Sequence, residues 1–314
     1  ICMEVFMIKV KGELCLFLAA LIWGSAFVFQ KMGMDFIGPL TFGFFRFTIG
    51  ALALLPVIYI CDRIKKKRNE SITGFKDRVL LKGSILCGLA NFVAGSLQQM
   101  GIVYTTAGKA GFITSLDIVI VPIFLIFLKQ KVSPAVWGGV AAASVGLYLL
   151  CITDGFSIGM GDSLVIGCAF AYSFQILLID YFAERADPVK LSFLQFLLAG
   201  ILSGIVAIPF ETIDLGSVLD CSIPILYTAI LEVSAAFTLQ IVGQKYVQAS
   251  VAAIIMSLEA VFSAIFGALV LQEAMSGREL AGCILMFAAF LITQADEFKG
   301  LICKNREKNK QEKI

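Results

Sequence analysis

Three carboxylates and one guanidinium stand inside otherwise apolar stretches of this sequence. The acids are Asp117, Glu232 and Glu259, and the cation is Arg46. A charge at the centre of a bilayer helix costs about 2.5 to 3.5 kcal/mol on insertion scales, so such side chains normally face protein or a water-filled cavity. They can bind an amine, a carboxylate or a coupling proton. These four residues are therefore candidates for a substrate or coupling site.

Two of the acids occupy matching places in an internal repeat. Residues 104–121 read YTTAGKAGFITSLDIVIV, and residues 246–263 read YVQASVAAIIMSLEAVFS. A shift of 142 residues aligns the two segments and places Asp117 on Glu259. Each acid lies about ten residues into its span, roughly 14 Å deep and near the bilayer midplane. Duplication explains the match most simply.

Neutral side chains at matched places extend the candidate site. The shift of 142 aligns Gln98 with Gln240, and a shift of 149 aligns Trp23 with Tyr172 because one loop is longer in the first copy. Asn91 lies seven residues before Gln98 and shares its helical face. These amides and rings can line a cavity, but interhelical hydrogen bonds, lipid contact or core packing would equally explain them.

The charges are less symmetric than the repeat. Arg46 aligns with Gln195, and Glu232 aligns with Ala90. Arg46 can have a structural role, by binding carbonyls or an acid such as Asp117, or it can bind substrate, and the sequence leaves both interpretations open. If the unmatched charges face a solute, a cation and acids together favour a zwitterion such as an amino acid.

Proline distinguishes the two acid-bearing helices. Pro122 follows Asp117 by five residues, lacks an N–H and predicts a kink in its helix. The matched position in the second copy is Ala264, which predicts that the helix carrying Glu259 is straighter.

The elements that carry these residues are membrane spans. The sequence is 59% hydrophobic and 15% charged, with a mean hydropathy of +0.91. A soluble domain carries about 25% charged residues, and a span needs roughly 17 to 25 apolar ones. We predict an all-α integral membrane protein of ten transmembrane helices, as two inverted five-helix repeats around a central cavity. The predicted spans are 13–30, 39–61, 82–103, 109–128, 135–152, 162–182, 190–210, 224–243, 250–271 and 279–297.

Basic residues set the predicted orientation. Of the 25 Lys and Arg residues, 21 fall on one side of the predicted bilayer, including the run IKKKRNE and the basic C-terminal segment. Cytoplasmic loops carry such an excess, so both termini are predicted to be cytoplasmic. The same runs could bind nucleic acid or anionic lipid, but topology already explains them, and no nucleic-acid partner is expected.

Several function classes lack their usual residues. The sequence has no histidine, no C-x-x-C motif and no G-x-x-x-x-G-K-[ST] loop, and its nine cysteines offer no pair in the predicted outer loops. Zinc sites, histidine-based nucleophile pairs and ATP-driven pumping would need those features. We therefore expect no metal, no cofactor and no enzymatic activity.

Taken together, several segments resemble the EamA-type family of the drug/metabolite transporter superfamily. They are LIWGSAFVFQK, PLTFGFFRFTIGAL, AGKAGFITSLDIVIVPIF, TLQIVGQKYVQASVAAIIMSLEAVFSAIFGALVLQE and ELAGCILMFAAFLI. The resemblance implies a carrier of the bacterial plasma (inner) membrane. Together with the internal repeat and the basic residues, we expect five-helix repeats at 12–152 and 161–297 and a basic cytoplasmic tail at 298–314. Arg46 matches an arginine position of the family and Glu259 matches an acid position, whereas Asp117 departs from the family pattern.

These features predict a secondary transporter, an exporter of a small organic metabolite, that works by alternating access. Its partners would be the solute, the lipid bilayer and coupling protons, and the sequence leaves monomer and homodimer open. An uncoupled metabolite facilitator is the close alternative. An intramembrane lipid-modifying enzyme and a receptor that binds without transport are the alternatives from other classes.

Overall fold

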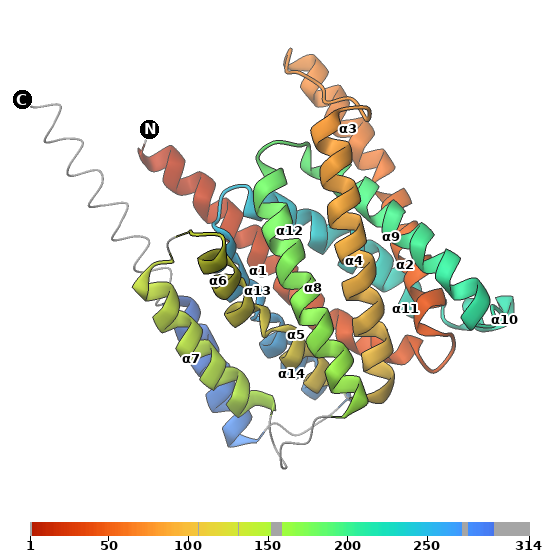
Figure 1. The fold of residues 1–314 in the computed structure, drawn as a ribbon, viewed down its shortest axis with the longest axis vertical. Helices are drawn as coiled ribbons and strands as arrows, with labels where there is room; N and C mark the ends of the chain where they lie inside the picture. The colour runs from red at the N-terminus through yellow and green to blue at the C-terminus, as the bar shows by residue number, and fades with distance from the viewer. Residues whose placement is uncertain (1, 106, 131, 152–158, 272–275, 292–314) are drawn as a thin grey trace, which may run out of the picture.

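The computed structural model describes residues 2–105, 107–130, 132–151, 159–271 and 276–291. Within these residues the chain forms helices joined by short loops and no β-strand (Figure 1). The predicted all-α membrane protein is confirmed. The predicted cytoplasmic tail at 298–314 lies outside the described residues.

The first half of the chain folds into seven helices. They are α1 (Cys2–Gly33), α2 (Pro39–Ala53), α3 (Leu55–Lys67), α4 (Arg78–Tyr104), α5 (Ala107–Thr114), α6 (Asp117–Phe127) and α7 (Pro134–Cys151). Pro39 begins α2, where its missing N–H costs nothing, and Asp77 caps α4 by accepting a hydrogen bond from the N–H of Leu80.

The second half repeats this order with more interruptions. Its helices are α8 (Met160–Ala183), α9 (Pro188–Phe210), α10 (Leu215–Asp220), α11 (Ser222–Tyr227), the π-helix η1 (Thr228–Ala236), α12 (Phe237–Gln244), α13 (Ala249–Met256) and α14 (Glu259–Leu271). A further helix runs through 277–291 to the end of the described residues.

Eight helical segments of the described chain are long and apolar enough to cross a bilayer. They are Lys9–Gly33, Pro39–Lys67, Arg78–Tyr104, Lys109–Phe127, Met160–Ala183, Pro188–Phe210, Ser222–Gln244 and Ala249–Leu269. Each coincides with a predicted span. The span predicted at 135–152 corresponds to the shorter apolar helix Pro134–Leu149, and the one at 279–297 extends beyond the described residues. The ten-helix count therefore stays a prediction.

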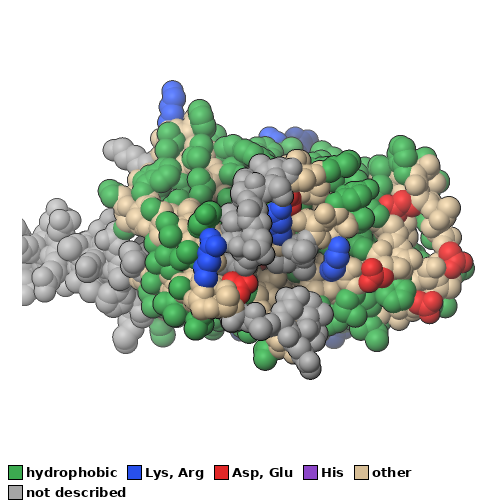
Figure 2. Space-filling model, turned by 90° about the horizontal axis from the view of Figure 1, so that it is seen from below, with side chains coloured by type: hydrophobic (Ala, Val, Ile, Leu, Met, Phe, Trp, Pro, Cys, Tyr) green, Lys and Arg blue, Asp and Glu red, His purple; other side chains and the backbone are tan. Residues whose placement is uncertain are grey.

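The helices form one bundle with an apolar outer surface. Figure 2 views the bundle from below Figure 1 and shows hydrophobic side chains along both flanks. Many large apolar side chains on the outside are exposed, such as Ile205 on α9 and Ile284 in the last helix. Such a surface suits a protein inside a bilayer, because lipid chains cover it there. Helix α7 and the helix at 277–291 pair on one side of the bundle (Figure 1).

Helices α2 and α9 occupy matched positions of the repeat and run antiparallel. The carboxylate of Glu211, at the end of α9, accepts hydrogen bonds from the backbone N–H groups of Leu40 and Thr41 at 2.8 and 2.7 Å. At the other end of the pair, Lys190 Nζ lies 2.8 Å from Asp62 Oδ2. The shift of 149 aligns Asp62 with Glu211 and Thr41 with Lys190. The matched positions thus meet at both ends of this helix pair.

Candidate functional site

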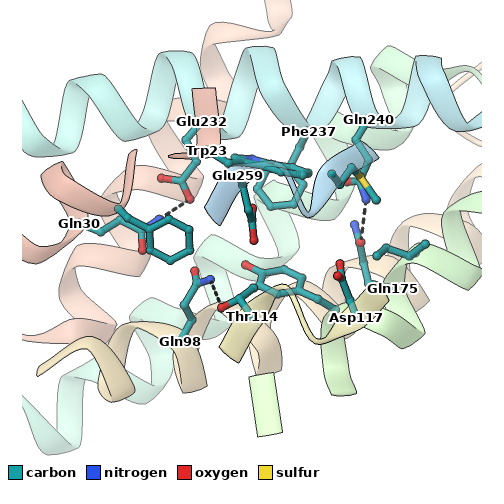
Figure 3. A pocket seen from close by; sticks show the side chains of 14 residues that line it. Trp23, Gln30, Gln98, Thr114, Asp117, Gln175, Glu232, Phe237, Gln240 and Glu259 are labelled. Atoms are coloured by element: carbon teal, nitrogen blue, oxygen red, sulfur yellow. Dashed lines mark hydrogen bonds between the residues drawn. The ribbon is translucent and has the colours of Figure 1, made fainter. Parts of the chain in front are cut away.

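A small cavity of about 40 Å³ lies at the centre of the bundle (Figure 3). Its lining joins the two halves of the chain. The lining residues are Trp23, Phe27, Gln30, Gln98, Thr114, Asp117, Tyr172, Gln175, Ile176, Glu232, Phe237, Gln240, Met256 and Glu259. The described residues contain no group of three or more His, Cys, Asp or Glu side chains that could hold a metal ion.

Asp117 and Glu259 enter the cavity from two interrupted helices. The first acid begins α6 after a break at Ser115 and Leu116, and the second begins α14 after a break at Ser257 and Leu258. The helix N-terminus carries partial positive charge, which favours a carboxylate there. Interrupted helices near the midplane are a common construction of transporter binding sites.

The break corrects the expectation drawn from proline. We predicted that Pro122 kinks its helix and that the second helix is straighter, yet both helices break at the same matched place, ahead of the acid. The N–H of Leu116 donates to Ile113 and that of Leu258 donates to Ile255, both at 3.2 Å. These bonds span three residues instead of four, so the turn tightens. Proline cannot be the cause, because the second copy breaks without one.

The hydroxyl at the break connects the two halves of the cavity. Ser115 Oγ lies 3.5 Å from Glu259 Oε1, across the repeat. Asp117 Oδ1 is buried and has no hydrogen-bond partner within the described residues. Both acids are 7% exposed. Two carboxylates therefore face the same small space, one of them held by a weak hydrogen bond.

Glu232 reaches the cavity from the π-helix η1 and is held by two donors. Arg46 Nη1 and Gln30 Nε2 each donate to Glu232 Oε1 at 2.9 Å. Arg46 is fully buried and its guanidinium stacks 4.6 Å from the centre of the Phe47 ring. A π-helix has hydrogen bonds that span five residues instead of four, and it often occurs at functional sites. Arg46 therefore binds an acid, as one of its two interpretations expected, but that acid is Glu232 and not Asp117.

Of the nine residues predicted for the site, seven line the cavity. They are Trp23, Gln98, Asp117, Tyr172, Glu232, Gln240 and Glu259. Arg46 lies behind Glu232, outside the lining. Asn91 also lies outside it, because its Nδ2 donates to Gln195 Oε1 at 3.0 Å between α4 and α9. For Asn91 the interhelical alternative describes the contact better than the cavity interpretation does.

Sequence reasoning missed several lining residues that periodicity could have found. Phe27 and Gln30 follow Trp23 by four and seven residues on α1 and therefore share its face. On α8, Gln175 lies three residues after Tyr172 in the same way. Gln175 also accepts a hydrogen bond at 3.4 Å from the amide of Gln240, a predicted residue.

Most of the lining follows the internal repeat. Ten of the fourteen residues form five matched pairs. The pairs are Trp23 with Tyr172, Phe27 with Ile176, Gln98 with Gln240, Thr114 with Met256 and Asp117 with Glu259. Gln30, Gln175, Glu232 and Phe237 line the cavity without a lining mate. Matched positions of the two copies thus line one cavity, and the four unmatched residues make its lining asymmetric.

A second hollow of about 570 Å³ lies at the end of the bundle where α1 begins, which is the predicted cytoplasmic end. Asp180, Glu184 and Lys245 are among its charged lining residues. It lies next to the cavity along α12, because Gln244 lines the hollow and Gln240, one turn away, lines the cavity. We call this hollow the inner vestibule.

The opposite end of the bundle is tied together by lysines. Lys31 Nζ donates to the carbonyls of Ile102 and Thr105 at 2.7 and 3.2 Å, at the end of α4. Lys109 Nζ lies 2.6 Å from Asp162 Oδ2 at the start of α8. The shift of 149 aligns Lys31 with Asp180. Lys31 therefore holds its end of the bundle together, whereas its matched residue Asp180 lines the vestibule.

Comparison with known proteins agrees with this architecture. The sequence profile of the EamA-like transporter family matches residues 10–152 and again residues 159–294. An uncharacterized transporter of Archaeoglobus fulgidus is 34% identical over 290 residues, which cover 90% of this chain and 86% of that protein. A WAT1-related chloroplastic protein of Arabidopsis thaliana is 23% identical, with coverage of 88% and 67%.

A solved structure supports the fold. One crystal structure superposes with a TM-score of 0.73 at 19% identity and covers 90% of this chain and 95% of that one. At this identity the likeness concerns the fold alone. The family profile, by contrast, matches almost the whole chain, and the 34% identical relative is named a transporter. The chain belongs to the EamA-like transporter family and is a multi-pass membrane protein.

Proposed function

We propose that this protein is a secondary transporter that moves a small organic solute by alternating access. The observation that carries the proposal is the central cavity, in which five pairs of matched residues from the two copies face one another. Inverted repeats around a midplane site allow the same cavity to open toward either side, because each half can adopt the conformation of the other.

The two halves are the five-helix repeats at 12–152 and 161–297, in a frame of ten transmembrane helices. The two matches of the family profile, 10–152 and 159–294, support these limits. The antiparallel contacts of α2 with α9 support inversion, since Asp62 and Glu211 are matched residues at opposite ends of that pair. Helix α7 is peripheral in this arrangement, and it contributes no residue to the lining given above.

The described conformation supports loading from the cytoplasm. The vestibule is open at the end of the bundle that we assign to the cytoplasm, whereas Lys31 and Lys109 tie the opposite end. Both termini are cytoplasmic in this proposal, in a bacterial plasma membrane. An inward-facing cavity that accepts a cytoplasmic solute is the starting state of an exporter.

Protons are the proposed coupling ion. Asp117 and Glu259 lie in the cavity outside any ion pair of the described chain, so either can exchange a proton with water that enters it. Glu232 is a weaker candidate because Arg46 already neutralises it. The uncoupled facilitator remains the alternative, and it differs only in the roles of these two acids.

Counterflow in proteoliposomes tests the proposal directly. Vesicles that contain purified protein are loaded with single members of a metabolite panel, and uptake of the same labelled metabolite is followed. A transporter accelerates uptake of at least one solute above protein-free vesicles, and an internal excess of that solute drives transient accumulation. Binding without accumulation for every panel member would indicate a receptor, and turnover of a lipid substrate would indicate an enzyme.

A further inference from the structure

The cavity holds more acidic than basic side chains. The ion pair with Arg46 cancels Glu232, and that cation is fully buried outside the lining. Asp117 and Glu259 form no ion pair within the described residues, and no Lys or Arg belongs to the lining. A buried carboxylate is stable only with a compensating charge or a proton. The cavity therefore favours a ligand that brings positive charge.

The unpartnered polar atoms in the lining mostly need donors. Gln30 must present its N–H to Glu232, which leaves Gln30 Oε1 as a buried acceptor without a partner in the described chain. Glu232 Oε2 and Asp117 Oδ1 are in the same condition. Trp23 Nε1 is an unpartnered donor, and the amides of Gln175 and Gln240 leave one donor and one acceptor between them. An ammonium group carries donors and no acceptor, so it fits this set.

Aromatic rings supply the apolar part of the site. Trp23 and Phe237 meet edge to face with their ring centres 4.8 Å apart, and Tyr172 lies 6.2 Å from Phe237. Phe27 completes the aromatic lining. Ring faces attract cations, and the attraction is strongest for tryptophan and in desolvated sites. Figure 3 shows the rings of Trp23 and Phe237 on the same space as the acids.

We infer that the solute is an organic cation, a protonated primary or secondary amine on an apolar or aromatic body, bound by Asp117 and Glu259. This inference deepens the proposed transport function and rests on it, because only a transporter would carry the bound cation as its solute. It replaces the zwitterion expected from the sequence, because no Lys or Arg belongs to the lining, and Arg46 is held behind Glu232 and outside it.

Charge-matched ligands test the inference. Two sets keep the body similar and change the charge: 2-phenylethylamine, phenylalanine and 3-phenylpropionate form the aromatic set, and butylamine, norvaline and pentanoate form the aliphatic one. Binding to protein in nanodiscs is followed by tryptophan fluorescence. The sequence has two tryptophans, so Trp137→Phe leaves Trp23, in the cavity lining, as the reporter. Counterflow is measured separately with the same compounds.

We expect the amine of at least one set to bind at least about tenfold more tightly than its zwitterion and its anion, since a hydrogen bond between charged groups is stronger than one between neutral groups. The double variant Asp117→Asn with Glu259→Gln should lose this preference. Asp214→Asn, in an exposed loop, should keep it. A monodisperse gel-filtration peak and an unchanged emission maximum show that each variant is folded.

Other outcomes separate the inference from the transport proposal. Tighter binding of a zwitterion or an anion in either set, or no binding of either amine, overturns the inference. Retention of the amine preference in a folded double variant also overturns it, because the acids then do not recognise the charge. Amine binding without counterflow supports the site chemistry and contradicts transport.

Discussion

Arg46 and Glu232 form a buried ion pair, so Glu232 is neutralised, unlike the other two acids of the cavity. Nη1 of the arginine lies 2.9 Å from Oε1 of the acid, and their side chains are 0% and 3% exposed. Gln30 donates to the same oxygen. The pair ties α1, α2 and η1 together at the wall of the cavity. It leaves Asp117 and Glu259 as the acids available to a proton or a solute.

We predict that removing one partner of this pair costs far more than removing both. Arg46→Gln leaves Glu232 buried without its cation, which typically costs about 3 to 5 kcal/mol of unfolding free energy. In the double variant with Glu232→Gln, the loss should be clearly smaller. The measurement is unfolding by sodium dodecyl sulfate in mixed micelles. Arg63→Gln, on the exposed part of α3, is the control. Additive losses in the double variant would mean that the two residues are not coupled.

Sequence reasoning predicted the spans well because hydropathy reports burial in lipid directly. Within the described residues, all eight segments that are long and apolar enough to span a bilayer lie where apolar runs predicted them. Depth along those runs also brought Asp117, Glu232 and Glu259 to one level, and the structure brings them to one cavity. Counting residues from a span's start is sufficient here, since helical rise is nearly constant.

The partners of these residues could not be predicted, since they depend on how the helices face one another. Three acids at similar depth were available to Arg46, and only the register of η1 against α2 selects Glu232. The breaks before Asp117 and Glu259 carry no Gly or Pro signal, and the symmetric sequence Ser-Leu-acid was interpreted only as a repeat marker. A serine that back-bonds, as Ser257 does to the carbonyl of Ile254 at 2.9 Å, is a weak signal for such a bend.

Close packing behind Glu259 gives a second prediction. A Cβ at Gly24, on α1, would lie 2.5 Å from Phe262 Cβ and 2.7 Å from the carbonyl oxygen of Glu259. Gly24→Ala must therefore push α1 away from α14, which we expect to cost about 1 to 3 kcal/mol and to reduce transport. Gly138→Ala is the matched control, since nothing lies within 4 Å of its added Cβ. Equal melting temperatures of the two variants would contradict this packing.

Acid should weaken the contact between α3 and α9. Burial acts to raise the pKa of Asp187, but the hydrogen bond and charge of Lys65, together with Lys190, outweigh it and hold the pKa below its ordinary value. A lowered folded pKa gives stability that is complete above the unfolded value of about 3.9 and is lost as pH falls through the folded value.

Asp187→Asn should accordingly lower the melting temperature at neutral pH, and its difference from the native protein should shrink below about pH 4. The measurement is a thermal melt in detergent over a pH series, with Asp220→Asn, at an exposed position, as the control. A difference that stays constant through the acid range would show that the carboxyl contributes no pH-dependent stability.

Orientation is tested by single cysteines in a background without the natural ones. Asp220 is exposed near the predicted outer end, and Glu70 is exposed in the basic loop predicted to be cytoplasmic. In intact cells, an impermeant maleimide should label Asp220→Cys and not Glu70→Cys, because the basic loop stays inside. Both should be labelled after permeabilisation. The reverse pattern in intact cells would invert the topology and turn the vestibule into an outer opening.

The last prediction concerns the roles of the three acids in coupling. If Asp117 and Glu259 carry the coupling proton, Asp117→Asn or Glu259→Gln should abolish the pH dependence of net transport and leave solute exchange at least partly active. Glu232→Gln should instead keep the pH dependence and lower stability, because it removes the partner of Arg46 and not a free carboxylate.

Net flux along a pH series and exchange at fixed pH separate these effects in proteoliposomes. Unchanged pH dependence in the Asp117 and Glu259 variants would leave the uncoupled facilitator as the better description. If only Glu232→Gln abolished it, the proton site would lie at the ion pair and Arg46 would be part of the coupling machinery.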